Sequence, residues 1–288
     1  MKTGRPARLW LLAALMLLTS GCASMKVVRV MDDTEVAPAR LAEWLRPSRL
    51  ILVGEAHDEM RDHEMQLAVI RLLHAAGRDI AIGMEMFNAE DQAALDRWAA
   101  GTMTEAELFA VYNRNWKVPW RNYREILLYA RVNGIPVVGM NINREVVHQV
   151  FKSGFGSLTP EQRKMLPGAR CDVSPAYEAF IRKTVGDHEI KDAAFINFCE
   201  AQMVWDVFMA ATATTYLDAH PGRAMVALAG SGHVLKYAMP EQVRRLSNIP
   251  YAVILPQAHG WFEHDKIGAL EADYMLVDRY EFLRIDGE

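Results

Sequence analysis

Short apolar segments alternate with helix-like stretches along most of this chain, and that alternation constrains the fold more than any other feature. We predict strands at 49–53, 79–84, 135–140, 224–229 and 251–255, with a last one at 274–277. Segments with helical periodicity separate most of them. Strands that alternate with helices predict an α/β fold, in which helices flank a mostly parallel sheet.

One long stretch departs from this alternation. Residues 153–219 contain no predicted strand, and Ala193–Ala219 could form a single long helix. We therefore expect a smaller helical subdomain at 153–219, inserted into an α/β domain made of residues 49–152 and 220–288. Residues 22–48 are predicted to be a tether that ends in a first short helix.

The first 21 residues have the pattern of a bacterial lipoprotein signal peptide. A basic start is followed by about ten apolar residues at 9–18, too few for a helix that spans a bilayer. Thr19-Ser20-Gly21-Cys22 resembles a lipobox, in which Cys22 is acylated, for example by palmitate, and anchors the chain. Ala23 resembles the outer-membrane sorting pattern, which predicts a cell-envelope protein facing the periplasm. The alternative is an ordinary secretory signal that contains a cysteine.

The charge balance argues against a nucleic-acid partner. Removal of residues 1–21 takes away three basic and no acidic residues, so the formal net charge falls from −4 to −7. Proteins that bind nucleic acid usually present a basic face. We therefore expect no nucleic-acid binding.

Two cysteines remain beyond the signal peptide. Cys171 and Cys199 lie about 28 residues apart, and an exported protein sits in a compartment that permits disulfides. A bridge between them would stabilise the fold by about 3–4 kcal/mol on the chain-entropy model. Two unpaired thiols, one of them buried in a helix, are the equal alternative.

Polar residues follow three of the predicted strands. Glu55 and His57 follow the first strand, Glu85 follows the second, and His233 follows a Gly-Ser-Gly turn after a later strand. In a parallel sheet, ligands bind at the carboxyl ends of the strands. We expect these four residues to converge on one pocket, although each alone could be a helix cap or a surface contact.

His63 and an aromatic stretch each allow two interpretations. His63 could face the same pocket or be a hydrogen-bonded core histidine, and the core reading is favoured. Tyr112, Trp116, Trp120 and Tyr123 have helical spacing, but Pro119 favours a break. These aromatic residues are either a packing stripe, the favoured reading, or a flat wall for a planar ligand.

Tyr237 lies four residues after His233, in the segment that follows the Gly-Ser-Gly-His turn. Tyrosinate can ligate ferric haem iron. In that case Lys236 and His233 could bind the haem propionates. The alternative is that Tyr237 only packs against the core.

Taken together, these motifs resemble the ChaN-like family of haem-binding lipoproteins. The resemblance covers most of the mature chain and rests on several short motifs: Gly54-Glu55-Ala56-His57-Asp58, Met84-Glu85-Met86-Phe87, Asn141-Ile142-Asn143-Arg144, Gln202 with Trp205-Asp206 and Met209-Ala210, and Gly230-Ser231-Gly232-His233. It implies a parallel-sheet domain, a smaller helical domain, and haem binding during iron uptake.

The resemblance also implies roles for individual residues. One tyrosine would hold the haem iron, and a histidine and a lysine would hold the propionates across a homodimer. Tyr237 is the expected iron ligand and Tyr177 is the alternative. Glu55 and His57 are also expected to line the haem site. The chain has Ala238-Met239-Pro240 where the family often has Gly-Ile-Pro, so the shape of this loop departs from the family pattern.

Distant relatives that share these strand ends include metal-dependent proteases and erythromycin esterases. By that analogy, Glu55, His57 and His233 would bind a divalent metal such as zinc, manganese or cobalt, and Glu85 would act as the base. The leading hypothesis remains a membrane-anchored haem-binding lipoprotein that is not an enzyme. The alternative is a metal-dependent hydrolase.

Overall fold

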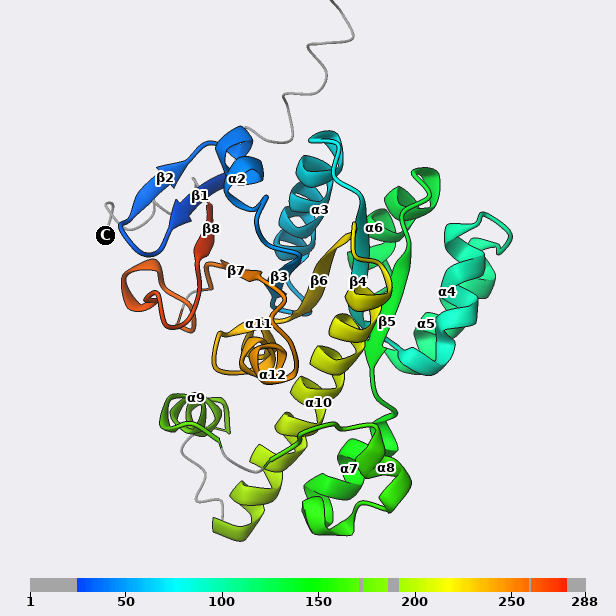
Figure 1. The fold of residues 1–288 in the computed structure, drawn as a ribbon, viewed down its shortest axis with the longest axis vertical. Helices are drawn as coiled ribbons and strands as arrows, with labels where there is room; N and C mark the ends of the chain where they lie inside the picture. Colours follow the sequence, from blue (N-terminus) through cyan, green and yellow to red (C-terminus); the bar gives the residue numbers. More distant parts are fainter. Residues whose placement is uncertain (1–24, 171–172, 186–191, 259, 279–288) are drawn as a thin grey trace, which may run out of the picture.

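Eight strands form one mixed sheet in the computed structural model, which describes residues 25–170, 173–185, 192–258 and 260–278 (Figure 1). The order across the sheet is β2-β1-β8-β7-β3-β6-β4-β5. The strands are β1 Met25–Arg29, β2 Thr34–Val36, β3 Leu50–Glu55, β4 Ile80–Asn88, β5 Val137–Asn141, β6 Ala224–Gly230, β7 Tyr251–Pro256 and β8 Tyr274–Asp278. Strands β8, β7, β3, β6, β4 and β5 are parallel. The predicted α/β fold with a mostly parallel sheet is therefore confirmed.

Helices cover both faces of this sheet. The α-helices are α2 Pro38–Trp44, α3 Met60–Ala75, α4 Gln92–Ala99, α5 Glu105–Asn115, α6 Arg121–Val132, α7 Arg144–Ser153, α8 Pro160–Lys164, α9 Pro175–Val185, α10 Asp192–Ala219, α11 Ser231–Val234 and α12 Met239–Leu246. Three short 3-10 helices are η1 Ala89–Asp91, η2 Phe155–Ser157 and η3 His264–Lys266.

Side chains of each strand alternate between two cores, as the pleat of a strand requires. On β3, Ile51 and Val53 pack with α3 to α6, whereas Leu50 and Leu52 pack on the opposite face with α10 and α12. Glu55 continues the first set and contacts α3 and α6. The sheet therefore delivers Glu55 to one side of its carboxyl edge.

Strand β4 ends at Asn88, four residues later than its sequence indicated. Its pairing with β5 is irregular between Met84 and Asn88, and Asn88 pairs with Asn141 beyond the irregularity. Gly139 makes this possible, because a Cβ there would lie 2.5 Å from the backbone oxygen of Asn88. Glu85 consequently lies inside the strand, with its peptide oxygen bonded to the Asn141 amide.

The helix after β3 begins at Met60, where the Glu59 side chain caps it by accepting a hydrogen bond from the Arg61 N–H at 3.3 Å. Asp62 occupies the first turn and accepts a hydrogen bond from the Ala56 N–H at 2.7 Å. This bond fixes the loop that carries His57.

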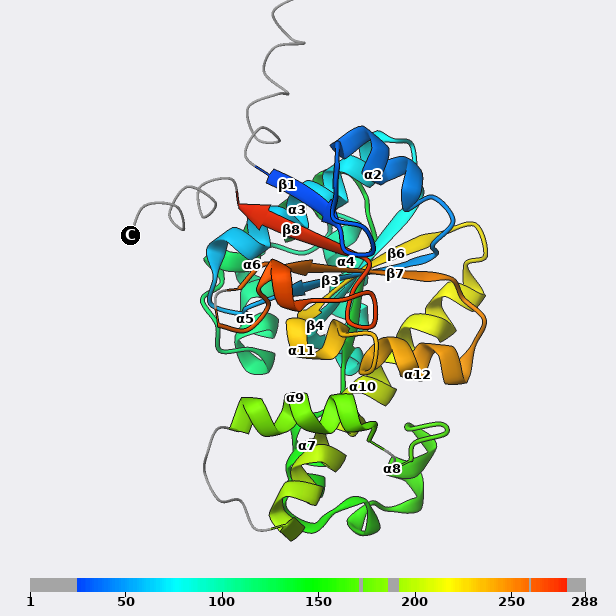
Figure 2. The same ribbon diagram turned by 90° about the vertical axis from the view of Figure 1, so that its left-hand side faces the viewer.

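Helices α7, α8 and α9 form a lobe beneath the sheet, and α10 runs from this lobe to the sheet (Figures 1 and 2). The core is continuous through the junction, since Val147 and Phe195 of the lobe belong to the same cluster as Met225 of the sheet. The lobe also contains α7, whose residues we had placed in the sheet domain.

The segment predicted as a tether adds to the sheet. Residues 25–36 form β1 and β2, and β1 pairs antiparallel with both β2 and β8. Cys22 and the signal peptide lie outside the described residues, so their roles stay predictions. None of the helices in the described ranges has the length and hydropathy needed to cross a bilayer.

Cys199 is a buried cysteine of α10 and belongs to no disulfide among the residues described. Burial raises the pKa of its thiol to about 11. Cys171 lies outside those residues, so the bridge between the two stays a prediction.

Candidate functional site

The carboxyl ends of β3, β4 and β6 meet at one edge of the sheet, where they carry the four predicted site residues. Glu55 pairs with Gly230 across β3 and β6. The Glu85 carboxylate accepts a hydrogen bond from the Gly230 N–H at 2.7 Å. His57 and His233 follow within a few residues, so residues up to 178 positions apart in the sequence share one location.

Glu55 is the most completely bonded of these residues. One carboxylate oxygen accepts hydrogen bonds from the Tyr123 hydroxyl at 2.5 Å and from His57 Nδ1 at 2.8 Å. The other oxygen accepts from Gln66 Nε2 at 2.8 Å and lies 3.3 Å from His63 Nδ1. Burial alone would raise the pKa of Glu55, but His57 and His63 hold it at about 2. Glu55 is therefore a buried carboxylate anion.

His57 is oriented by this carboxylate. Its Nδ1 faces Glu55, and the edge of the Trp116 ring packs against it with the ring centroids 4.9 Å apart. Its side chain is 37% exposed, so the remaining nitrogen, Nε2, can reach a ligand. Burial disfavours the charged ring, but Glu55 and the charge of Glu85 raise its pKa.

His233 is held in the same way by a different carboxylate. Its Nδ1 lies 2.7 Å from Oδ1 of Asp206, a buried residue of α10. The second oxygen of Asp206 accepts a hydrogen bond from the Tyr177 hydroxyl at 2.5 Å. His233 Nε2 lies 4.0 Å from Glu85. Burial opposes the charge, but Asp206 and Glu85 raise the pKa of His233 to about 9.

A cavity of about 330 Å³ opens above these groups, between the sheet edge and α9. Glu55, His57 and His233 line its polar end. Its other walls are largely apolar and aromatic, formed by Phe180, Ile181, Phe198, Trp261 and Phe262. We call this cavity the sheet-edge pocket.

Tyr237 and Lys236 lie in a different cavity. This cavity of about 410 Å³ is also lined by Arg245, Leu270 and Tyr177, and we call it the Tyr237 cavity. Tyr177 lines both cavities and separates them, with its ring centroid 5.6 Å from that of Tyr237. The structure thus divides the set Tyr237, Lys236 and His233 that the sequence grouped together.

The polar groups of the Tyr237 cavity are partly engaged. Lys236 donates hydrogen bonds to Asp273 at 2.6 Å and to the Ala269 carbonyl, while Arg245 pairs with Glu241. The hydroxyl of Tyr237 makes no hydrogen bond within the described ranges. Burial and the charge of Glu271 raise the pKa of Tyr237 above its usual value.

The structure shows where His63 and the aromatic stretch lie. His63 is a buried histidine whose Nε2 lies 3.1 Å from the His57 carbonyl oxygen, which is the core reading. Helix α5 ends before Pro119, and Tyr112 and Tyr123 are buried in the core. Of the aromatic stretch, Trp116 reaches the site through its contact with His57.

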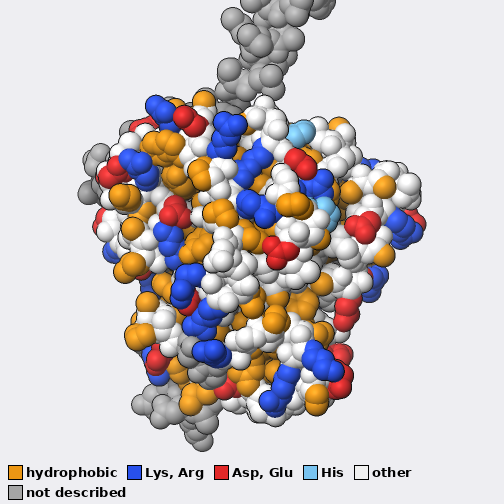
Figure 3. All heavy atoms as spheres, viewed as in Figure 1, with side chains coloured by type: hydrophobic (Ala, Val, Ile, Leu, Met, Phe, Trp, Pro, Cys, Tyr) orange, Lys and Arg blue, Asp and Glu red, His pale blue; other side chains and the backbone are white. Residues whose placement is uncertain are grey.

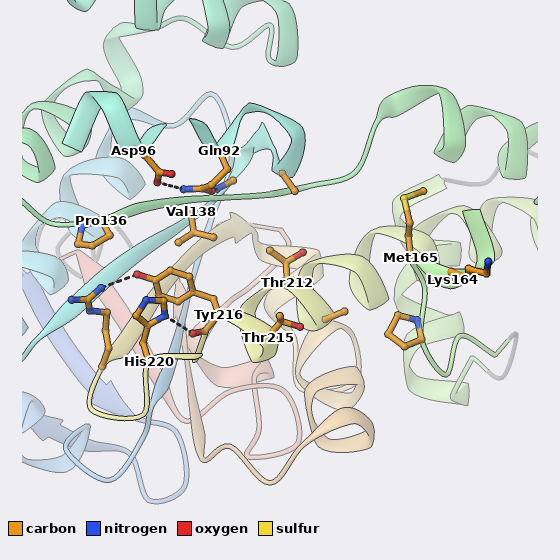
Figure 4. A pocket seen from close by; sticks show the side chains of 15 residues that line it. Gln92, Asp96, Pro136, Val138, Lys164, Met165, Thr212, Thr215, Tyr216 and His220 are labelled. Carbon is orange, nitrogen blue, oxygen red and sulfur yellow. Dashed lines mark hydrogen bonds between the residues drawn. The ribbon is translucent and has the colours of Figure 1, made fainter. Parts of the chain in front are cut away.

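A larger hollow lies on another part of the molecule, between β5, α4 and α10 (Figure 4). Its polar side chains mostly bond to one another or to nearby backbone: Tyr216 to Arg223, His220 to the Tyr216 carbonyl, and Gln92 to Asp96. Gln92 also bonds the edge of β5, donating to the Val137 carbonyl and accepting from the Gly139 N–H. This hollow therefore presents few free groups to a ligand.

The part of the chain that the structure describes contains no preformed cluster of metal ligands. There, no group of three or more His, Cys, Asp or Glu side chains is placed to hold a metal ion. In both His57 and His233, the Nδ1 atom is hydrogen-bonded to a carboxylate. Histidines that bind a metal often have the same kind of bond at their second nitrogen.

Sequence reasoning gave no role to several residues that build the site. Asp206 appeared only within the family resemblance, although an acid among the apolar residues 203–211 was a usable signal. Gln66 and Tyr123 complete the bonds of Glu55, but their sequence positions carry no sign of it. Tyr177 was considered only as an iron ligand.

Comparison with known proteins identifies the family of this chain. The family model described as "Haem-binding uptake, Tiki superfamily, ChaN" matches residues 41–243. The chain belongs to the ChaN family. The solved structure "Cofacial heme binding to ChaN of Campylobacter jejuni" is similar with a TM-score of 0.67 and 19% identity, covering 89% of this chain and 98% of that chain. It supports the ChaN fold.

Two other proteins are also similar to this ChaN-family chain. An erythromycin esterase, EreC, in its open conformation matches with a TM-score of 0.48 and 14% identity, over 92% of this chain and 87% of that chain. The chloroplastic Protein RETICULATA-RELATED 5 of Arabidopsis thaliana is 25% identical over 153 residues, which is 50% of this chain. The match spans 21% of the length of that plant protein.

Proposed function

We propose that this protein binds haem in the Tyr237 cavity and serves haem or iron uptake at the cell envelope. The observation that carries the proposal is the donor set of that cavity: a tyrosine hydroxyl without a hydrogen bond in the described structure, beside Lys236 and Arg245. Tyr237 would hold the iron, and the two cations would hold the propionates. Membership of a haem-binding family supports this assignment.

The chemistry of the cavity fits a haem group. Ferric haem iron accepts a tyrosinate ligand. The raised pKa of Tyr237 keeps its hydroxyl protonated in the absence of haem, so the iron would have to displace that proton to gain a tyrosinate ligand. Apolar side chains of Ala176, Met203 and Leu270 line the same cavity and suit a porphyrin face. Lys236 and Arg245 would exchange their present carboxylate partners for propionates.

The sheet-edge pocket fits a haem group less well. Glu55 lines it, and among its described lining residues none is Lys or Arg. Two propionates would therefore find no Lys or Arg partner among those residues. For this reason His233, Glu55 and His57 are not part of the haem site that we propose.

The outer surface near the Tyr237 cavity suits a second copy of the chain. Leu270 at the cavity is 81% exposed. Figure 3 shows Lys and Arg side chains among apolar ones over the region of α9 and α12. We propose a homodimer that brings two such cavities together, an arrangement in keeping with the cofacial haem described for the Campylobacter jejuni protein.

We further propose that acylated Cys22 anchors the protein in the outer membrane, facing the periplasm. The signal-like sequence before Cys22 supports this. Cys22→Ser should move the protein from the membrane fraction to the soluble fraction and stop incorporation of a labelled fatty acid. Unchanged labelling in that variant would refute the anchor.

Haem binding is tested by titrating ferric haem into the purified protein and recording its absorption spectrum. Wild type should show a saturable high-spin tyrosinate spectrum that Tyr237→Phe abolishes. Tyr129→Phe is the matched control, because Tyr129 is a partly buried tyrosine of α6, which packs on the opposite face of the sheet. Lys236→Gln should weaken binding about tenfold, the loss of one charged hydrogen bond.

Two outcomes would count against the proposal. A tyrosinate spectrum that survives in Tyr237→Phe removes Tyr237 as the ligand and directs the test to Tyr177→Phe. Absence of any saturable spectral change in wild type refutes haem binding itself.

A further inference from the structure

The sheet-edge pocket contains chemistry that the proposed haem site does not use. Two imidazoles, His57 and His233, lie at its polar end, and each has its Nδ1 held by a buried carboxylate at 2.7–2.8 Å. We propose that this pocket is a second, catalytic site. It would hydrolyse neutral carboxylic esters without a metal, with His57 as general base and His233 as general acid.

The position of His57 suits a general base. Glu55 fixes the ring through Nδ1, which leaves Nε2 as the free nitrogen. The backbone is also fixed, because Asn122 Nδ2 donates to the His57 carbonyl oxygen at 3.2 Å. Gly230 gives Nε2 its space, since a Cβ there would lie 3.1 Å from it. With 37% of the side chain exposed, His57 can reach a water molecule.

The position of His233 suits a general acid. It lies between two carboxylates, Asp206 at Nδ1 and Glu85 near Nε2, and both favour the imidazolium form. Only 13% of its side chain is exposed, so it lies deeper than His57. His233 and His57 both line the sheet-edge pocket, so a proton on His233 Nε2 can be delivered to a ligand held there.

Asp206 and Glu55 are positioning residues in this scheme. Asp206 is anchored by the Tyr177 hydroxyl and Glu55 by Tyr123 and Gln66. These bonds keep each carboxylate beside its histidine. Such carboxylate–histidine pairs set the tautomer and direction of a catalytic imidazole.

The walls of the pocket indicate the substrate class. Phe180, Phe198, Trp261 and Phe262 offer apolar contact to an acyl chain or an aromatic alcohol. No Lys or Arg is found among the described lining residues, and the two imidazoles are already paired with Glu55 and Asp206, so a phosphate or carboxylate substrate would lack an unpaired cation there. The pocket therefore suits a small uncharged ester.

The reaction balances with water as the only co-reactant. His57 Nε2 takes a proton from water as its oxygen forms a bond to the ester carbonyl carbon. The bond from that carbon to the alkoxy oxygen then breaks, and the leaving alcohol takes a proton from His233 Nε2. The products are a carboxylic acid and an alcohol, and solvent returns the two histidines to their starting protonation states.

The test compares two butyrate esters that differ in leaving group. 4-Nitrophenolate leaves without a proton, whereas benzyl alkoxide needs one. His57→Asn should slow both esters by about 10²–10⁴-fold, the usual contribution of general base catalysis. His233→Asn should slow benzyl butyrate by a similar factor and 4-nitrophenyl butyrate far less. Asp206→Asn should show the leaving-group pattern of His233→Asn.

This leaving-group pattern separates catalysis from a loss of folding, which would slow both esters equally. His148→Asn is the matched control, because His148 is an exposed histidine of α7. Thermal unfolding and haem titration of each variant check that its fold is retained.

Three results would overturn the proposal. The first is that wild type hydrolyses neither ester. The second is that His233→Asn slows both esters equally. The third is that EDTA abolishes the activity and zinc or manganese restores it. The last result would instead support a metal-dependent hydrolase. None of them bears on haem binding, which has its own spectrum and its own cavity.

Discussion

Replacement of Glu55 by Gln should destabilise the protein, because the carboxylate is the centre of a buried hydrogen-bond network. Each carboxylate oxygen faces two groups, Tyr123 and His57 on one side and Gln66 and His63 on the other. The glutamine amide has one oxygen and one NH₂ group. Whichever way it is turned, one pair of buried donors faces another donor.

The magnitude follows from the loss of these acceptors. A buried donor left without a partner costs about 1–3 kcal/mol. With one pair of donors affected and some relaxation, Glu55→Gln should lower the free energy of unfolding by about 2–4 kcal/mol. Glu64→Gln, an exposed change on the neighbouring helix α3, should alter it by less than about 0.5 kcal/mol.

The effect should depend on pH in a definite direction. The pKa of Glu55 falls from an ordinary 4.5 to about 2 in the folded protein, so its charge stabilises the fold above pH 4.5, and the stabilisation is lost as pH falls toward 2. The pKa of His63 is raised by Glu55 against the effect of burial. Its charge stabilises the fold below its ordinary pKa of 6.5, and this contribution is lost as pH rises through the raised value. The gap between wild type and Glu55→Gln should thus be widest near pH 5–6.

Urea unfolding followed by circular dichroism at pH 3, 5.5 and 9 measures this gap by linear extrapolation. The reasoning is refuted if Glu55→Gln unfolds within about 0.5 kcal/mol of wild type at pH 5.5, the level expected of a surface change. If the difference in unfolding free energy between wild type and Glu55→Gln is the same at all three pH values, charged histidines do not stabilise the Glu55 carboxylate.

Two further predictions concern the scaffold. Gly139→Ala should lower the free energy of unfolding by about 1–3 kcal/mol, because its Cβ would meet the Asn88 backbone oxygen at 2.5 Å, and Gly156→Ala, where nothing lies within 4 Å, is the control in the same urea experiment. Cys199 should stay unreactive toward a thiol reagent such as DTNB at pH 8 in the folded Cys171→Ser variant, because its pKa is raised to about 11, and rapid reaction before urea is added would contradict its burial.

The alternation of strands and helices was enough to predict the six parallel strands but not β1 and β2, because each buried parallel strand leaves a short apolar run in the sequence. The positions of Glu55 and His233 at strand ends could likewise be read directly. What could not be read was which side of the sheet edge each residue faces. Glu85, for example, depends on the irregular pairing of β4 with β5, which no local sequence pattern encodes.

The helical lobe shows a second limit of the sequence. Tyr177 and Asp206 come from α9 and α10, and their meeting depends on how the lobe packs against the sheet. Such long-range contacts arise from the shape of the whole core rather than from a periodic pattern. The sequence therefore indicated a single pocket with Tyr237 and His233 together, where the structure has two cavities.

The wall between these cavities decides which tyrosine can serve the haem. Tyr177 turns its hydroxyl toward Asp206 and lies beside Tyr237 with its ring, so a ligand in the Tyr237 cavity meets the ring of Tyr177 while the hydrogen bond to Asp206 stays intact. If Tyr177 were the iron ligand, its hydroxyl would have to give up its hydrogen bond to Asp206. Asp206, which holds His233, would then no longer be anchored. Haem binding would then disturb the sheet-edge pocket. The two sites can be independent only if Tyr237 binds the iron, so ester hydrolysis that is unchanged by saturating haem would itself argue for Tyr237.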